Sequence, residues 1–357
     1  MIALLIIIGL SLLILIHEFG HFIVAKLCGI RVEEFGFGFP PRLFTRRFGE
    51  TLYSINLLPF GGFVRMEEEL GAEEGAPLSP RSFARKPYWQ QALVIVAGVV
   101  MNVFFGWILF VGVFLSGTPQ HLAVVDVVSG SPADAAGVRS GDIVMEAAFG
   151  EVALQDPIAL DAFIALVEQA GEHELSLSVL QEGGSHAVAL RGRLDPPPGQ
   201  GSLGVSLTEI GISSLGFFGS LKAATLTTIR MTGFIAQGIF SFFRELFSGF
   251  AIFKSVVGPV GAVSFAAQTG TLGAAYLLQF IAFISLNVAL FNLLPFPVLD
   301  GGRLLLLVFE KIKGKPLSRR VQAGLNTAGF VLLLGLVVLV TIHDVQRIVF
   351  LPGFHFV

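Results

Sequence analysis

Residues 2–25 read IALLIIIGLSLLILIHEFGHFIVA, and this stretch decides the fold class. A helix needs about 20 predominantly apolar residues to cross a bilayer, and this run is long enough. A secretory signal peptide would have a basic start and a small-residue cleavage site, but no Lys or Arg precedes Lys26. The apolar run also continues beyond His17 to Val24. We therefore expect a transmembrane helix that is retained.

The composition of the whole chain is that of a membrane protein. Of its 357 residues 54% are hydrophobic and 14% are charged, whereas soluble domains average about 25% charged residues. The formal net charge is -3, and the sequence has no basic stripe of the kind that would indicate nucleic-acid binding. The single cysteine, Cys28, excludes an internal disulfide framework and a cysteine-based zinc cage, and we expect it to be a small buried apolar residue.

Further apolar segments complete a predicted set of four spans. Residues 214–253 are rich in Phe but interrupted by charged residues, which favours amphipathic helices on the membrane surface over a fifth span. The three further spans are predicted at 92–116, 276–298 and 325–342.

Charge asymmetry predicts the orientation of these spans. Lys and Arg are concentrated in the loops after the first and third spans, and none occurs at 108–138 or 255–302. The positive-inside rule then places both loops in the cytoplasm and the N-terminus and middle region outside. In the first loop Phe35, Phe37 and Phe39 alternate with glycines, which predicts a small β-sheet beside the membrane. Residues 67–80 are predicted to be an acidic flexible linker.

The outside segment resembles a single PDZ domain. The resemblance lies in Ser131-Pro132-Ala133-Asp134-Ala135-Ala136-Gly137-Val138 and Ser140-Gly141-Asp142-Ile143, within strand and helix signals in the expected order. Ser131 and Asp134 are suited to cap a short helix, and Gly137 is suited to end it. PDZ domains bind peptides by β-addition. The usual glycine-rich carboxylate loop is missing before Val124, which argues against binding of free C-termini.

The motif His17-Glu18-Phe19-Gly20-His21 carries the predicted chemistry. Positions i and i+4 share one helix face, so both imidazoles could hold one Zn²⁺ while Glu18 acts as a general base. The composition predicts only about 0.01 chance matches to this pattern. Ionisable residues in a membrane helix are costly unless they are paired or metal-bound. The alternative is a set of satisfied polar residues between packed helices.

Catalytic zinc keeps three protein ligands and one open position, so a third ligand is needed. Asp300 is the best candidate because it lies at the cytoplasmic end of the third span, on the same side as His17, and it is the only acidic residue between Glu245 and Glu310. A helix-capping aspartate is the alternative. The two prolines in 292–297 predict local unwinding, which could expose backbone groups and asparagine side chains to a substrate strand or an oxyanion. A packing kink is the other interpretation.

Together these residues resemble the site-2 protease family, and most closely the bacterial regulator of sigma-E protease (RseP) type. The match includes His17-Glu18-x-x-His21, Asn292-x-x-Pro295-x-x-x-Leu299-Asp300-Gly301, Asn56-Leu57-x-Pro59-x-Gly61-Gly62-Phe63-Val64 and Gly98-x-x-x-Asn102, with a PDZ-like segment between the second and third spans. The chain departs from several relatives in having one PDZ-like domain instead of two. It also has Val99 where Pro usually follows the glycine.

The resemblance implies a zinc metalloendopeptidase that cuts transmembrane segments in regulated intramembrane proteolysis. His17, His21 and Asp300 would be the zinc ligands and Glu18 the catalytic base. Substrate contacts are expected at Asn292, Pro295, Asn287, Gly61 and Gly62. Partners would be single-span membrane proteins, such as anti-sigma factors or signal-peptide remnants, with a peptide or substrate ectodomain at the PDZ-like domain. The expected location is the bacterial inner (cytoplasmic) membrane.

The predicted fold is a polytopic α-helical membrane protein with about four transmembrane helices, a cytoplasmic-side membrane-associated β-loop and one extracytoplasmic PDZ-like domain. Two rivals remain: an anchored zinc protease whose site lies in the cytosol, and a PDZ-bearing scaffold or transporter. The apolar surroundings of His17 disfavour the first, and the lack of an internal repeat disfavours the second. The predicted segments are span 1–27, β-rich loop and linker 28–91, span 92–116, PDZ-like 117–195, surface helices and linker 196–275, span 276–302, loop 303–324, span 325–346 and tail 347–357.

Overall fold

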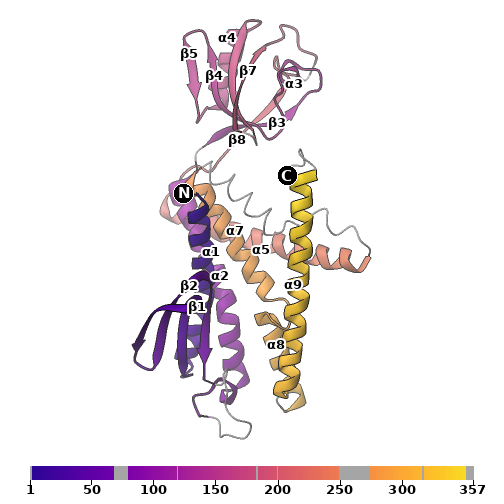
Figure 1. The fold of residues 1–357 in the computed structure, drawn as a ribbon. Helices are drawn as coiled ribbons and strands as arrows, with labels where there is room; N and C mark the ends of the chain where they lie inside the picture. Colours follow the sequence, from indigo (N-terminus) through magenta and orange to yellow (C-terminus); the bar gives the residue numbers. More distant parts are fainter. Residues whose placement is uncertain are drawn as a thin grey trace. The chain divides into compact units, whose positions relative to one another are not determined.

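The computed structural model describes residues 2–67, 79–118, 120–181, 184–198, 200–248, 273–315 and 317–350. The chain forms two compact units (Figure 1). One unit combines Met1–Gly112 with Ser220–Val357, and the other is Val113–Gly219. Most of the predicted acidic linker lies outside the described residues.

The first unit is mainly helical. Among the described residues, four helices are long and apolar enough to cross a membrane, as predicted, and α5 is not one of them. The helices of this unit are α1 (Ile2–Leu27), α2 (Tyr88–Ser116), α5 (Phe217–Ser248), α7 (Ala274–Asn292), α8 (Asp300–Lys313) and α9 (Arg319–Phe350), with a short 3-10 turn at Phe83–Arg85.

Glycines set the distances between the membrane helices. A Cβ on Gly20 of α1 would lie 2.5 Å from the carbonyl oxygen of Ala97 in α2. A Cβ on Gly9 would lie 2.6 Å from Ile281 of α7, and one on Gly106 of α2 would lie 3.1 Å from an α7 carbonyl. Small residues let helix backbones approach closely where lipid offers no hydrophobic driving force. These contacts bring α1, α2 and α7 close together.

The third span is shorter than predicted, and a helix replaces part of the predicted loop. α7 ends at Asn292, and 293–299 form turns, in agreement with the predicted unwinding. The predicted loop 303–324 is wrong in its first half, because α8 occupies Asp300–Lys313. The basic residues near its end made this segment look like a loop in the sequence, but in the helix they complement the helix dipole. Gly314 ends the helix in the left-handed conformation at φ 71°.

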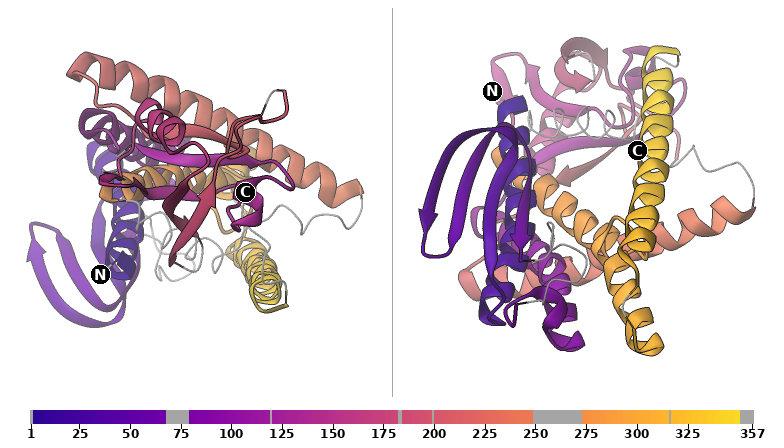
Figure 2. Two further views of the ribbon diagram at one scale, coloured as in Figure 1. Left: turned by 90° about the horizontal axis from the view of Figure 1, so that it is seen from above. Right: turned by 60° about the horizontal axis from the view of Figure 1, so that its bottom comes forward.

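The first loop forms one long antiparallel pair, β1 (Val32–Phe48) and β2 (Thr51–Met66). Both strands fold back, so that Phe35 pairs with Tyr53 on one side and with Val64 on the other. The pair therefore has four segments side by side, which lie beside α1 in Figure 2. The predicted small sheet is thus confirmed, and segment 62–66 forms one of its edges.

The second unit is an antiparallel sheet with a helix packed on it. Its strand order is β7-β6-β4-β3-β8, with β5 paired to β4. Its core is apolar and includes Leu122, Phe163 and Leu175, each at most 2% exposed. The elements are β3 (His121–Val127), α3 (Pro132–Ala135), β4 (Ile143–Phe149), β5 (Val152–Gln155), α4 (Leu160–Ala170), β6 (Glu174–Gln181), β7 (Gly184–Arg191) and β8 (Val205–Ile210).

This unit includes a capped helix and an additional edge strand. The predicted cap of α3 is confirmed, because Ser131 accepts a hydrogen bond from the Asp134 amide at 3.2 Å and Gly137 has φ 83°. The predicted boundary at residue 195 is too early, because β8 pairs with β3 and completes the sheet. Since β3 is paired on both sides, 122–125 is not an edge, and the strands at the two ends of the order are β7 and β8.

Candidate metal centre

Two buried histidines stand one turn apart on α1. His17 is 7% exposed and His21 is 9% exposed. Their rings meet edge to face with centroids 4.8 Å apart, and their Nε2 atoms lie 3.2 Å from each other. This is the geometry expected of positions i and i+4 on one helix face. Both Nε2 atoms therefore face one point between the helices.

Asp300 reaches the same point from the first residue of α8. Its Oδ2 lies 3.0 Å from His17 Nε2 and 3.4 Å from His21 Nε2. The turn before it is held by the Leu299 amide, which donates to the Phe296 carbonyl at 2.9 Å. The glycines that follow allow this turn to pack against α8, because a Cβ on either would collide with the carbonyls of 293–296. The Gly-Gly pair thus fixes where the carboxylate sits.

The three side chains fit a metal ion. One ligand atom from each of His17, His21 and Asp300 lies within 4.8 Å of the others. Oδ2 of Asp300 is buried and has no hydrogen-bond donor among the described residues, although both imidazoles approach it. His21 Nδ1 lies 2.7 Å from the Val94 carbonyl, which leaves its Nε2 lone pair toward the centre. Two imidazoles and a carboxylate suit Zn²⁺ with an open fourth position.

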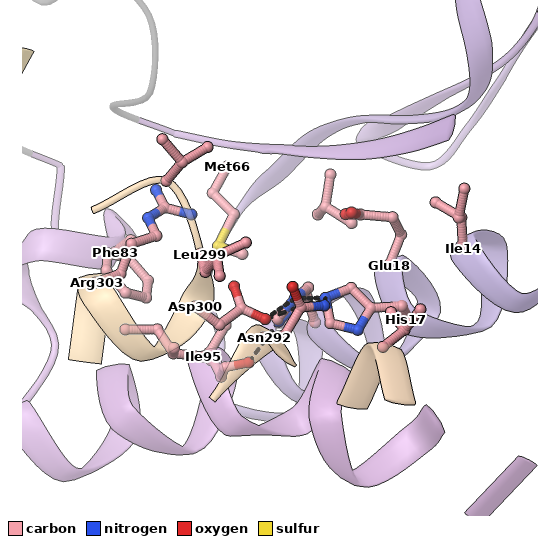
Figure 3. Close-up of a pocket in the computed structure, with 15 residues that line it drawn as sticks. Ile14, His17, Glu18, Met66, Phe83, Ile95, Asn292, Leu299, Asp300 and Arg303 are labelled. Atoms are coloured by element: carbon pink, nitrogen blue, oxygen red, sulfur yellow. Dashed lines mark hydrogen bonds and ion pairs between the residues drawn. The ribbon is translucent and has the colours of Figure 1, made fainter. Parts of the chain in front are cut away.

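Glu18 shares the pocket with this cluster. In Figure 3 its side chain extends over the space that Asp300 and His17 face. Strand β2 approaches Glu18 closely, because a Cβ on Gly62 would lie 3.1 Å from Glu18 Cγ. The cavity has a volume of about 330 Å³. Its lining is Ile14, His17, Glu18, His21, Val64, Met66, Phe83, Val94, Ile95, Val288, Asn292, Val298, Leu299, Asp300 and Arg303.

The predicted substrate-contact residues are only partly brought to the pocket. Asn292 lines it, and its Nδ2 lies 3.5 Å from His17 Nε2. Asn287 does not line it, because its amide donates to the Phe283 carbonyl of its own helix at 2.9 Å. Pro295 is exposed in the turns after α7.

The two glycines of β2 have different surroundings. Gly62 lies against Glu18 without lining the cavity itself, and Gly61 packs against the ring of Phe39. Gly61 adopts φ 102°, which favours glycine because other side chains are strained there. These glycines therefore shape the strand next to the pocket.

Residues of α2 were not predicted as part of the site. The Val94 carbonyl contacts His21, and the Asn102 side chain approaches His17 Nδ1 at 3.2 Å. A main-chain partner leaves no residue-type signal in a sequence. Asn102 belonged to a family motif, and its position in an apolar span was the available signal.

The sequence profile of peptidase family M50 matches residues 5–336. The chain belongs to this family, the site-2 proteases. A protein of Clostridium perfringens whose name describes it as a zinc metalloprotease is 36% identical over 345 residues, which cover 94% of this chain and 96% of the relative. One of Synechocystis is 34% identical over 353 residues, covering 97% and 94%. Zinc metalloprotease RasP of Shouchella clausii is 27% identical over 421 residues, covering 95% and 97%.

Family membership decides the general activity of this site-2 protease. The protein is a zinc metalloprotease, and the four apolar helices found among its described residues make it a multi-pass membrane protein. Of the two rival classes, the scaffold or transporter is excluded by this result. Zinc is the cofactor of the family, and among the described residues His17, His21 and Asp300 form a group that could hold a metal ion.

Proposed function

We propose that this site-2 protease hydrolyses peptide bonds within transmembrane segments, with zinc held by His17, His21 and Asp300. The observation that carries the proposal is the convergence of these ligand atoms within 4.8 Å, between apolar helices and beside Glu18. Bound zinc would act as a Lewis acid and activate water for attack. The side chains of all three proposed ligands are largely buried, which supports a site within the helical unit over one in a polar cytosolic domain.

Glu18 is proposed as the general base. It would take a proton from the attacking water and deliver it to the leaving amide nitrogen. Its position directly after His17 turns its side chain away from the ligand face and toward β2, where Gly62 leaves room for it. Asn292 would donate its amide to the developing oxyanion or to the substrate backbone, because it lines the pocket and its Nδ2 lies 3.5 Å from His17 Nε2.

The substrate must present an extended backbone, since a helix hides its carbonyls. Segment 62–66 supports pairing with such a strand. It is hydrogen-bonded to β1 on one side and has no strand partner on the other among the described residues. Val64 and Met66 of this segment line the pocket. Strand addition here would lay a locally unwound substrate beside the ligands and Glu18.

The unit Val113–Gly219 is proposed to bind a peptide or the substrate ectodomain in the manner of a PDZ domain. β8 is an edge strand with α4 beside it, where the Leu160 amide donates to Glu209 Oε1 at 2.8 Å. Leu203-Gly204-Val205 leads into β8, and Gly204 has φ 73°. This apolar–glycine–apolar turn precedes an edge strand, and we propose that it takes the place of the carboxylate loop that is missing before Val124. We therefore expect partners to bind at β8. The proposed orientation, with the N-terminus outside, places this unit on the outer side of a bacterial inner membrane.

The natural substrates are proposed to be single-span proteins, such as anti-sigma factors or signal-peptide remnants, cut in regulated intramembrane proteolysis. The test is cleavage of a model single-span substrate, truncated on its outer side, by the purified protein in detergent. Wild type should cut within the transmembrane stretch and lose activity on chelation. Glu18→Gln should abolish cleavage while zinc stays bound. Full activity of Glu18→Gln, or cutting only outside the apolar stretch, would refute the proposal.

A further inference from the structure

One face of α2 supplies contacts to both histidines of α1. Val94, Gly98 and Asn102 are spaced four residues apart and therefore share that face. The Val94 carbonyl lies 2.7 Å from His21 Nδ1, and the Asn102 amide lies 3.2 Å from His17 Nδ1. Between them Gly98 touches both imidazoles, because a Cβ there would lie 2.5 Å from His21 Nε2 and 2.7 Å from His17 Cε1. Each histidine therefore has its own partner on α2, which it contacts through its Nδ1 atom.

Asn102 is held firmly in this position. It is 0% exposed. Its main-chain carbonyl accepts a hydrogen bond at 2.8 Å from the hydroxyl of Ser285, a fully buried residue of α7. Its side-chain Oδ1 is buried and has no hydrogen-bond donor among the described residues. A buried amide with an unused oxygen is costly, so its presence inside a membrane helix calls for a role.

The orientation of the amide decides what His17 can do. If Nδ2 donates to His17 Nδ1, the proton of a neutral imidazole must lie on Nε2, the atom that faces Asp300 Oδ2 at 3.0 Å. That imidazole could not bind a cation through Nε2. If the amide is turned, Oδ1 accepts the proton of Nδ1 and Nε2 presents its lone pair to the centre. Because either orientation leaves one amide atom without a partner, the need of the metal decides between them.

We propose that Asn102 is a positioning residue that accepts a hydrogen bond from His17 Nδ1 and so holds His17 ready to bind zinc through Nε2. The inference rests on the proposed zinc role of His17. It makes α2 the outer shell of the centre, with the main-chain carbonyl of Val94 serving His21 and the side chain of Asn102 serving His17. Outer-shell acceptors of this kind fix the tautomer and ring orientation of a ligating histidine.

The test measures zinc affinity of the full-length protein in detergent, by competition with a chromophoric chelator. Asn102→Leu keeps the shape but has no acceptor, and it should raise the zinc dissociation constant about 10- to 100-fold. Asn102→Asp can accept but, when ionised, cannot donate, so it should stay within about threefold of wild type. Gln91→Leu is the matched control, since this buried amide on α2 donates to the Lys86 carbonyl at 2.7 Å. It should leave zinc affinity unchanged.

Two results would overturn the inference. One is wild-type affinity in Asn102→Leu. The other is weaker binding by Asn102→Asp than by Asn102→Leu, which would mean that the amide donates. If Asn102→Leu does not fold, Asn102→Asp alone decides, because a required donor would be lost and a required acceptor kept. His17→Ala separates the two levels of proposal: if it retains full zinc affinity, the proposed centre itself is wrong.

Discussion

Replacing Gly98 by Ala should damage the site more than any other one-methyl change on α2. The new Cβ would lie 2.5 Å from His21 Nε2 and 2.7 Å from Cε1 of both histidines. Ordinary carbon contacts begin near 3.4 Å, so the rings or the helices must yield by about 0.9 Å. The carbon would press directly on the atom proposed to bind zinc.

The structure offers the rings little room to escape. His21 is tied through Nδ1 to the Val94 carbonyl at 2.7 Å, and both Nε2 atoms must stay near Asp300. Gly20 already brings α1 and α2 into close contact through Ala97, so separating the helices would disturb their packing. A misplacement of about 1 Å can cost roughly 100-fold in rate. We therefore expect kcat/KM for the single-span substrate to fall by about 100-fold.

The assay compares Gly98→Ala with Gly112→Ala. Both changes add one methyl to a glycine of α2, but a Cβ on Gly112 would meet nothing within 4 Å. Initial rates of cleavage and bound zinc would be measured on the same detergent preparations. Gly112→Ala should resemble wild type in both. If Gly98→Ala also cleaves at a wild-type rate, the close packing of α2 on the histidines does not constrain the site, and the reasoning fails.

Two further predictions concern stability. The hydrogen bonds from Arg81 and then Lys26 lower the pKa of Glu50 from 4.5 to about 2. The stabilisation is therefore fully present above pH 4.5 and is lost as the pH falls toward 2. The unfolding temperature of wild type should exceed that of Glu50→Gln at neutral pH and converge with it in acid, and a constant difference would contradict this. Ser131→Ala removes the acceptor for the Asp134 amide and should cost about 1 kcal/mol in the unit Val113–Gly219. An unchanged urea midpoint for that unit would count against it.

Much of the helical frame could be predicted because its signals are local. The apolar runs mark the spans, and the four-residue spacing of His17 and His21 puts both rings on one face. Asp300 was visible as a lone acid after an apolar run, but its distance from the histidines depends on the turns at 293–299. Those turns require that Gly301 and Gly302 lack side chains. A sequence indicates this constraint only when the tertiary contact is already known.

The errors arose where pairing joins distant segments. The carboxylate loop of the second unit was sought before Val124, but β3 is an inner strand and β8 is an edge strand. Nothing in the six residues Val205–Ile210 says which strand they join. The role of Asn287 as a substrate contact stays a prediction, although its side-chain amide donates to the Phe283 carbonyl one turn earlier in the same helix. A polar residue in a span can contact a substrate or can form a hydrogen bond inside the protein, and only the packing distinguishes the two roles.

The contact between α1 and α2 shows where a sequence could have said more. His17 and His21 are spaced by four, and so are the α2 positions Val94, Gly98 and Asn102 that meet them. Two antiparallel helices with matching four-residue rows present a continuous row of contacts to each other. A glycine flanked one turn away by a buried amide is therefore a readable pattern opposite a His-Glu-x-x-His helix. The α2 residues that contact the two histidines therefore follow from helix spacing. The position of Asp300, the proposed third ligand, depends instead on the turns at 293–299.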